Sequence, residues 1–325
     1  MTATILVVGA TGNTGRGVVE TLSKLLETSN TLSGSRIIAL TRSLENPVAQ
    51  RLAGLPGVEF LEKNWVEITA DWLRKQGVTR AFIASHTEPN QFPEESGFHL
   101  AALQAGIQYV VRISTAAANV RPDCVAYYPR SHWAVEALLS SPEFAALQWT
   151  SLQPNLFANF AVGPAAALIK EYRKTGKQDT LRLMVPEHAP LAIIDPWEIG
   201  VLAAHLLAEA DPSPHNKARY VVNGPEDITG PQIVKLVEEY IGTRVENVSF
   251  GDMSWVEAMI AAMPSSKGVL LSVKHSLDSI EDEKWVASAT SNEVLKLSAP
   301  TPDGPQNALK DLVGGVTWKG GDDCC

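Results

Sequence analysis

The chain has 325 residues, of which 45% are hydrophobic, and it carries a formal net charge of −9. This length and composition are typical of one large globular domain or two smaller ones with a substantial core. The acidic balance argues against nucleic acid or an anionic membrane as a partner, because both require a basic face. The sequence has no run of 18 apolar residues and no basic N-terminal region, so we expect neither a membrane span nor a signal peptide.

Cysteine and histidine usage narrows the classes further. Three cysteines, Cys124, Cys324 and Cys325, cannot form a disulfide framework, so we expect a reducing, cytoplasmic setting. The seven histidines are scattered without a paired ligand motif, and we expect no metal site. The sequence leaves monomer and homodimer open.

Predicted strands and helices alternate through the first half of the chain. Apolar runs predict strands over residues 4–8, 36–41, 58–61, 80–84, 109–114 and 148–153. Helical patterns lie between them over residues 14–28, 46–54, 69–76, 94–106 and 131–141. Continuously apolar strands separated by helices indicate a parallel sheet covered on both faces, with right-handed crossovers. We therefore predict a Rossmann-type, doubly wound α/β domain over residues 1–153.

The rhythm weakens after Pro154, where proline and glycine become frequent. Asp195 and Pro196 predict the start of a helix that runs to about residue 209. The spacing of Thr229 and Gln232 predicts a capping box at the start of another helix. Residues 219–223 read as a strand that returns to the sheet. We predict a smaller, interleaved substrate-binding lobe over residues 154–319 and a flexible tail over 320–325.

The first predicted strand runs directly into a glycine-rich turn that opens the first helix. Gly9 permits the turn, Gly12 has no side chain to keep a pyrophosphate from the backbone, and Gly15 lets the helix pack closely on the strand. The positive end of the helix would then face the anion. The alternative is an ordinary glycine turn. The residues assigned to cofactor binding are Gly9, Thr11, Gly12, Asn13, Thr14 and Gly15.

The end of the second predicted strand indicates which nucleotide is bound. An acidic residue there would bind the adenosine ribose and repel a 2′-phosphate, whereas this chain has Arg42 and Ser43. We therefore predict NADP(H) rather than NAD(H). Arg42 could instead cap the strand end in solvent. Asn64 and Trp65 are placed to flank the adenine, although Trp65 could equally belong to the core.

Ligands of open α/β sheets bind at the carboxyl ends of the strands. The further cofactor-binding candidates at these ends are Ser85, His86, Ser114, Thr115, Pro154, Asn155 and Phe157. We expect His86 also to contact the substrate, with a solvent-facing loop histidine as the alternative. Asp123, Asn159 and Phe160 are further substrate candidates, of which the last two could be buried only for packing. One or two tryptophans could line an aromatic pocket, among Trp72, Trp133, Trp197, Trp255 and Trp285.

Four blocks of this sequence resemble the NmrA-like proteins, which are atypical members of the short-chain dehydrogenase/reductase superfamily close to the isoflavone-reductase-like enzymes. The blocks are residues 7–15, the Thr41-Arg42 pair, residues 132–136 and residues 149–159. The resemblance covers about residues 3–280. It implies a Rossmann-type domain, NADP(H) and a substrate cleft between this domain and the C-terminal lobe. Members range from reductases to redox-sensing regulators, and several fungal relatives act in alkaloid or polyketide pathways.

The superfamily's usual catalytic pair is Tyr-x-x-x-Lys, and here the pattern departs from it. Tyr128 occupies the tyrosine position, but His132 stands where the lysine is expected. A largely neutral histidine activates a phenol less than a lysine does, although it could still hold a ribose hydroxyl. Pro129 disfavours a helical conformation for Tyr128, which could then point away from the cleft. Arg130 could orient a carbonyl or carboxylate, or merely solvate the helix start.

These patterns favour an NADPH-dependent reductase that acts on a small, largely apolar molecule. The weakened Tyr128–His132 pair favours electrophiles that need little acid assistance, namely an imine, iminium or enone rather than a ketone. With the resemblance, this points to secondary metabolism, where hydride transfer could be followed by cyclisation. The alternative is a non-catalytic redox sensor that binds NADP(H) and acts through a protein partner. A weaker alternative is an isomerase.

Overall fold

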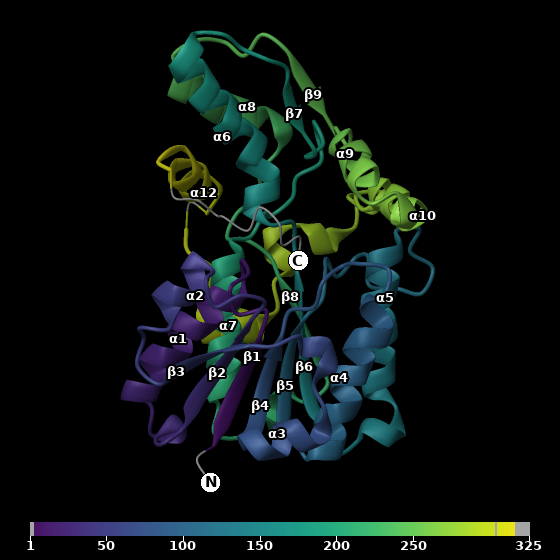
Figure 1. The fold of residues 1–325 in the computed structure, drawn as a ribbon. Coiled ribbons are helices and arrows are strands. Elements are labelled where there is room, and N and C mark those ends of the chain that lie inside the picture. The colour runs from purple at the N-terminus through teal and green to yellow at the C-terminus, as the bar shows by residue number, and fades with distance from the viewer. Residues whose placement is uncertain (1–2, 303, 316–325) are drawn as a thin grey trace.

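In the computed structural model, which describes residues 3–302 and 304–315, a seven-stranded parallel sheet forms the centre of the larger lobe (Figure 1). The strand order is β3-β2-β1-β4-β5-β6-β8. The strands are β1 (Thr4–Val8), β2 (Arg36–Thr41), β3 (Val58–Glu62), β4 (Val78–Ile83), β5 (Tyr109–Ile113), β6 (Gln148–Pro154) and β8 (Ala218–Val222). The order reverses between β1 and β4, which creates a topological switch point. The Rossmann-type prediction is confirmed, whereas the predicted tail at 320–325 lies outside the described residues.

Helices cover both faces of the sheet because successive strand residues point to opposite sides. Ile5 and Val7 of β1 pack into one core with α1 and α7, while Leu6 and Val8 pack into the other with α4 and α5. The first face carries α1 (Gly15–Thr28), α7 (Pro196–Ala208) and α11 (Asn292–Ser298), with α2 (Pro47–Leu52) beside α1. The second face carries α3 (Ala70–Gln76), α4 (Gln91–Ala105) and α5 (Tyr127–Ser140).

The smaller lobe packs around α6 (Ala158–Thr175), α8 (Gly230–Ile241) and α12 (Gly304–Val313), which share a core with the short pair β7 (Leu181–Leu183) and β9 (Val248–Phe250). Two further helices, α9 (Trp255–Ala262) and α10 (Lys267–Ser272), extend towards the start of α5 (Figure 1). There the Tyr127 amide donates to Ser272 Oγ at 2.8 Å. The chain also returns α7, β8 and α11 to the sheet, so the two lobes are interleaved; the division at residues 153 and 154 stays a prediction.

Two predicted helix starts are confirmed by their capping contacts. The Asp195 side chain accepts a hydrogen bond from the Trp197 amide at 2.8 Å, and Pro196 is the first residue of α7. Thr229 and Gln232 form the predicted capping box at the start of α8. Both caps satisfy amides that have no partner within the helix, which fixes where each helix begins.

The start of α5 differs from the prediction. The sequence places the helix at residues 131–141 and makes a helical Tyr128 unfavourable, but α5 begins at Tyr127. Pro129 therefore lies in the first turn, where an amide has no intrahelical acceptor, and its missing N–H costs nothing. The added residues place Tyr128 on the same helix as His132.

In the part of the chain that the structure describes, we find no single helix long and apolar enough to cross a membrane. The pair formed by residues 255–262 and 264–275, which is bent by 117° at its break, meets the criteria of length and composition only.

Candidate functional site

A cavity of about 220 Å³ lies above the carboxyl ends of β4, β5 and β6, between the two lobes. The sheet side contributes polar groups, which include Ser85, Ser114, Thr115, Tyr128, His132 and Asn155. The smaller lobe contributes an apolar wall made by Met184, Trp255, Met259, Val273, Leu277 and Trp285. The cavity thus joins a polar floor at the switch-point edge of the sheet to an apolar roof.

The glycine-rich loop opens into this cavity at Thr14, beside the start of α1. Gly9 has a φ of +79°, which favours glycine, and a Cβ on Gly15 would lie 2.0 Å from the Gly9 carbonyl oxygen. The Gly12 amide closes the turn on that same carbonyl at 3.0 Å. These contacts agree with the roles expected for Gly9 and Gly15.

The N-terminal end of α1 is suited to an anion. Thr14 makes no side-chain capping bond, and the first turn, whose residues the structure describes in full, contains no acidic side chain. Asn13 and Thr14 are buried, and Thr11 and Gly12 are partly exposed. The amides at such a helix start and the positive end of its dipole would face a bound phosphate. The loop therefore fits a pyrophosphate.

Ser114 gives a second indication that the cavity accommodates a polar ligand. Its side chain is buried and lines the cavity, yet Oγ has no hydrogen-bond partner among the described residues. An unpaired buried hydroxyl costs free energy, which a ligand that hydrogen-bonds to it would recover. Ser85 and Asn155 are also buried at this floor, and Pro154 and Phe157 line it beside them.

Tyr128 and His132 both line the cavity, one helical turn apart on α5. Tyr128 hydrogen-bonds to Thr115, and burial raises the pKa of its phenol. His132 is buried, and Arg112 Nη2 lies 2.9 Å from its Nδ1. Burial and the Arg112 charge lower the pKa of His132 to about 3, so the imidazole is neutral at physiological pH.

The predicted nucleotide-selecting residues lie at the end of β2, outside the cavity lining. Arg42 and Ser43 are exposed there, and Ser43 Oγ accepts a hydrogen bond from the Glu45 amide at 3.2 Å. The Asn64 side chain accepts from the Val66 amide at 3.2 Å and thus caps a short 3-10 helix. Trp65 is partly buried and packs against the core.

Several candidate substrate and catalytic residues lie outside the cavity lining. Arg130 is exposed, and its guanidinium lies 5.6 Å from the Tyr127 ring centre. Asp123 is exposed and pairs with Arg121 at 3.7 Å. His86 pairs with Glu94 and accepts from the Glu88 amide at 3.2 Å. Arg130, Asp123 and His86 therefore make their contacts outside the cavity lining.

The two remaining substrate candidates have different positions. Phe160 lines the cavity and stacks on Phe157, with ring centres 6.4 Å apart. Asn159 is only partly buried and does not line the cavity; its Oδ1 has no hydrogen-bond partner among the described residues. Of the tryptophans singled out, Trp255 and Trp285 line the cavity.

Sequence reasoning missed the charged groups that lie behind the floor. Arg112 is fully buried in β5 and contacts Glu95 of α4. Two features of the sequence indicate these groups. A lone arginine interrupts the apolar strand at residues 109–113, and three polar residues recur at four-residue spacing along α4. These are Gln91, Glu95 and His99. No group of residues suited to a metal ion occurs within residues 3–302 and 304–315.

Comparison with known proteins identifies the family. The model of the NmrA-like family matches residues 1–298. The chain belongs to the NmrA-like family. No curated protein matches the sequence of this NmrA-like protein.

Solved structures with the same fold include both enzymes and a regulator. The Escherichia coli NADPH-dependent quinone oxidoreductase QOR2, complexed with NADPH, is 18% identical with a TM-score of 0.66, over 94% of this chain and 98% of that chain. The Citrobacter sp. triphenylmethane reductase complexed with NADP(H) is 19% identical with a TM-score of 0.65, over 95% and 99%. NmrA, a negative transcriptional regulator, is 15% identical with a TM-score of 0.67, over 98% and 99%.

Proposed function

We propose that this NmrA-like protein is an NADPH-dependent reductase that acts on a small, largely apolar molecule. The observation that carries the proposal is the continuity of one cavity, which begins at Thr14 on the anion-binding end of α1 and ends at the apolar wall of the smaller lobe. The Ser114 hydroxyl, which has no partner among the described residues, lines the same cavity. Similarity in fold to reductases solved with NADPH or NADP(H) supports this assignment.

The residues of the floor favour an electrophile that needs little help from an acid. When bound, NADPH would supply a hydride at this position. Tyr128 lines the cavity and is our candidate proton donor, but burial raises the pKa of its phenol, and the neutral His132 supplies no positive charge to lower it. Tyr128 is therefore a weak acid. An iminium needs no proton from the protein, and a polarised enone needs less assistance than a ketone.

The apolar wall defines the rest of the substrate. Two tryptophans and two methionines face the cavity, which suits a flat, apolar skeleton, because methionine adapts its shape and aromatic rings stack. With the range of functions in the family, this supports an imine, iminium, enone or carbonyl intermediate of secondary metabolism. Such a cavity could also hold the reduced product during a cyclisation.

The proposal is tested by binding and by turnover. We expect calorimetry to detect tighter binding of NADPH than of NADH, and NADPH absorbance to fall with some members of a panel of cyclic iminium ions, enones, ketones, quinones and triphenylmethane dyes. Tyr128→Phe should lower kcat by about tenfold or less for an iminium and by about a hundredfold for a ketone. Tyr127→Phe is the matched control, because Tyr127 does not line the cavity. Absence of NADPH binding would contradict the proposal.

A redox sensor is the second candidate, and one observation favours it. His132 is neutral where the superfamily's lysine carries a charge, and NmrA shares the fold as a negative transcriptional regulator. Tight NADP(H) binding with no turnover over the whole panel, together with oxidation-dependent capture of a protein partner, would favour the sensor over the reductase.

A further inference from the structure

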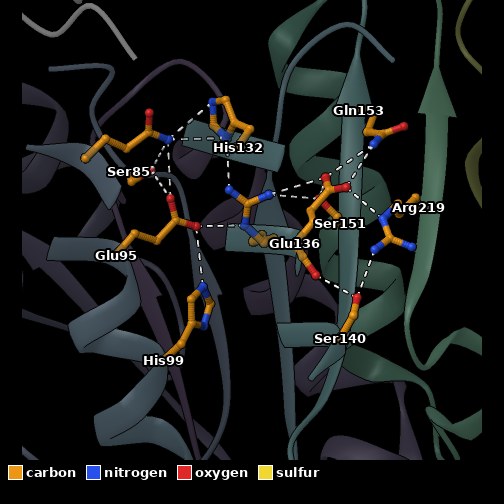
Figure 2. A network of polar contacts seen from close by, with 11 residues as sticks. Ser85, Glu95, His99, His132, Glu136, Ser140, Ser151, Gln153 and Arg219 are labelled. Atoms are coloured by element: carbon orange, nitrogen blue, oxygen red, sulfur yellow. Dashed lines mark hydrogen bonds and ion pairs between the residues drawn. The ribbon is translucent and has the colours of Figure 1, made fainter. Parts of the chain in front are cut away.

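A network of polar side chains runs from the cavity floor through the interface between the sheet and helices α4 and α5 (Figure 2). Its members are Ser85, Gln91, Glu95, His99, Arg112, His132, Glu136, Ser140, Ser151, Gln153 and Arg219. Two of them, Ser85 and His132, line the cavity. At the opposite end, Arg219 of β8 is partly exposed to solvent.

The charges in this network alternate along its length. Glu95 contacts Arg112 at 2.7 Å, Arg112 lies 3.5 Å from Glu136, and Glu136 contacts Arg219 at 2.7 Å. The side chains of Glu95 and Arg112 are 0% exposed, and that of Glu136 is 2% exposed. Replacing a buried ion pair by apolar residues of similar volume often leaves a core equally stable or more stable. Stability alone therefore does not account for this network.

Arg112 lies at the centre and uses each of its three nitrogens. Nε donates to Glu95 at 2.7 Å, Nη1 donates to Ser151 at 3.0 Å, and Nη2 donates to Nδ1 of His132 at 2.9 Å. A guanidinium is always protonated and can only donate. Nδ1 of His132 must therefore accept, which leaves the ring proton on Nε2.

Glu95 connects the same ion pair to a second group of the floor. Its Oε1 accepts from Arg112, and its Oε2 accepts from Ser85 Oγ at 2.7 Å. Ser85 and His132 come from different elements, yet both are held from behind by one buried pair. A shift of Arg112 or Glu95 would therefore move both Ser85 and His132.

We propose that Arg112, paired with Glu95, is a positioning residue that holds His132 as a neutral imidazole protonated on Nε2, so that Nε2–H donates to the ligand in the cavity. The ligand is taken to be NADP(H), so this half of the proposal rests on the proposed function. The tautomer itself is a property of the ligand-free protein. The histidine then acts as a fixed hydrogen-bond donor and not as an acid.

Of the groups that face His132, Arg112 favours the neutral imidazole and Glu95 opposes it. Arg112 on β5 opposes a second positive charge, whereas Glu95 on α4, which is paired with the same guanidinium, favours one more weakly. The Gln91 amide nitrogen, also on α4, lies 3.3 Å from both ring nitrogens and, as a donor, can hydrogen-bond only to the unprotonated Nδ1. Tyr128 on α5 lines the same cavity and stays protonated because burial raises its pKa.

Nitrogen-15 NMR of the histidine rings tests the tautomer without any ligand. The His132 signals are identified by their loss in His132→Gln. We expect an unprotonated Nδ1 and a protonated Nε2 whose signals do not move between about pH 5 and 8. A protonated Nδ1, or titration within this range, would overturn the proposal.

The double variant Arg112→Met/Glu95→Gln tests the positioning role, since it removes one charge of each sign and leaves Glu136 paired with Arg219. We expect the His132 signals to titrate within that pH range and NADPH binding to weaken about fivefold to tenfold and become pH-dependent. Arg219→Gln is the matched control, because Arg219 belongs to the network but does not contact His132. It should leave the ring signals and NADPH affinity unchanged.

The NMR and binding experiments together distinguish failure of the positioning proposal from failure of the proposed function. If the double variant keeps the wild-type tautomer, pH independence and NADPH affinity, burial alone fixes His132 and the proposal is overturned. If wild-type protein binds no NADPH, the proposed function fails and so does the ligand half, while the ring signals still decide the tautomer. Should circular dichroism show that the double variant is unfolded, Arg112→Lys replaces it, because an ammonium cannot donate to Glu95, Ser151 and His132 together.

Discussion

At the scale of single residues, the cavity floor contains one group that lowers the stability of the ligand-free protein. Ser114 Oγ is buried and has no partner among the described residues, while Tyr128 beside it hydrogen-bonds to Thr115. A buried hydroxyl without a partner loses its hydration and gains nothing in return. The folded, ligand-free protein is therefore less stable than it would be with an apolar group of the same size, unless a ligand supplies the missing bond.

Ser114→Ala should separate these two effects. We expect the free energy of unfolding of the ligand-free protein to stay unchanged or to rise by about 1 kcal/mol, and NADPH affinity to fall several-fold. Denaturant unfolding and calorimetry measure the two quantities. Ser33→Ala, at an exposed turn before β2, is the control and should alter neither. Loss of stability without loss of affinity would show that Ser114 serves the fold.

At the scale of elements, α7 begins at Asp195, a cap whose buried carboxyl destabilises the folded state when it is ionised at neutral pH. Asp195 caps the helix, but burial raises the pKa of its carboxyl from 3.8 to about 6. Because the folded state holds this proton more tightly than the unfolded state, the stabilisation is complete below about pH 3.8 and is lost as the pH rises through 6.

Asp195→Asn should remove this pH dependence and keep the cap, since asparagine also accepts a bond from the Trp197 amide. We expect the stability of the variant relative to wild type to increase between pH 4 and 7, by about 2–3 kcal/mol in total. Denaturant unfolding at each pH measures it. The exposed Asp211, whose pKa is lowered by hydrogen bonds from Ser213, is the control, and Asp211→Asn should change relative stability in the opposite direction. A flat difference for Asp195→Asn would contradict the argument.

The elements also explain how much could be predicted from the sequence. Most strands of the main sheet are apolar on both faces, so the sequence predicts them as apolar runs. The glycine turn after β1 and the caps at Asp195 and Thr229 could also be predicted, because each depends on residues close together in sequence. Strands β7 and β9 have three residues each, too few to produce a period. Of the apolar wall, the sequence offered only Trp255 and Trp285 as candidates, because its residues are far apart in sequence and only tertiary packing brings them to one cavity.

At the scale of the whole molecule, two asparagines connect the ends of the sheet to the smaller lobe. Asn155, just after β6, donates to the carbonyl of Trp285 at 2.8 Å, and Asn223, just after β8, donates to that of Val286 at 2.7 Å. The two amides also hydrogen-bond to each other at 3.0 Å. Because Trp285 lines the cavity, these contacts set the distance between its floor and its roof.

Asn223→Ala should loosen this connection. We expect a loss of about 1–3 kcal/mol of stability, because the Val286 carbonyl and the Asn155 amide each lose a buried partner, and a several-fold weaker affinity for NADPH. Thermal unfolding and calorimetry measure them. Asn307→Ala, at an exposed position of α12, should be close to neutral. Equal effects of the two variants would contradict a role for Asn223 in joining the lobes.

The return of α7, β8 and α11 to the main sheet has a consequence for how the chain melts. A fragment that ended after β6 would leave the sheet face beneath α7 bare, and the remainder would lack the sheet on which three of its own elements rest. Neither half is then an autonomous folding unit, so calorimetric heating should give a single cooperative transition. A coenzyme bound at the start of α1 would therefore raise the unfolding temperature of the smaller lobe by the same number of degrees as that of the sheet.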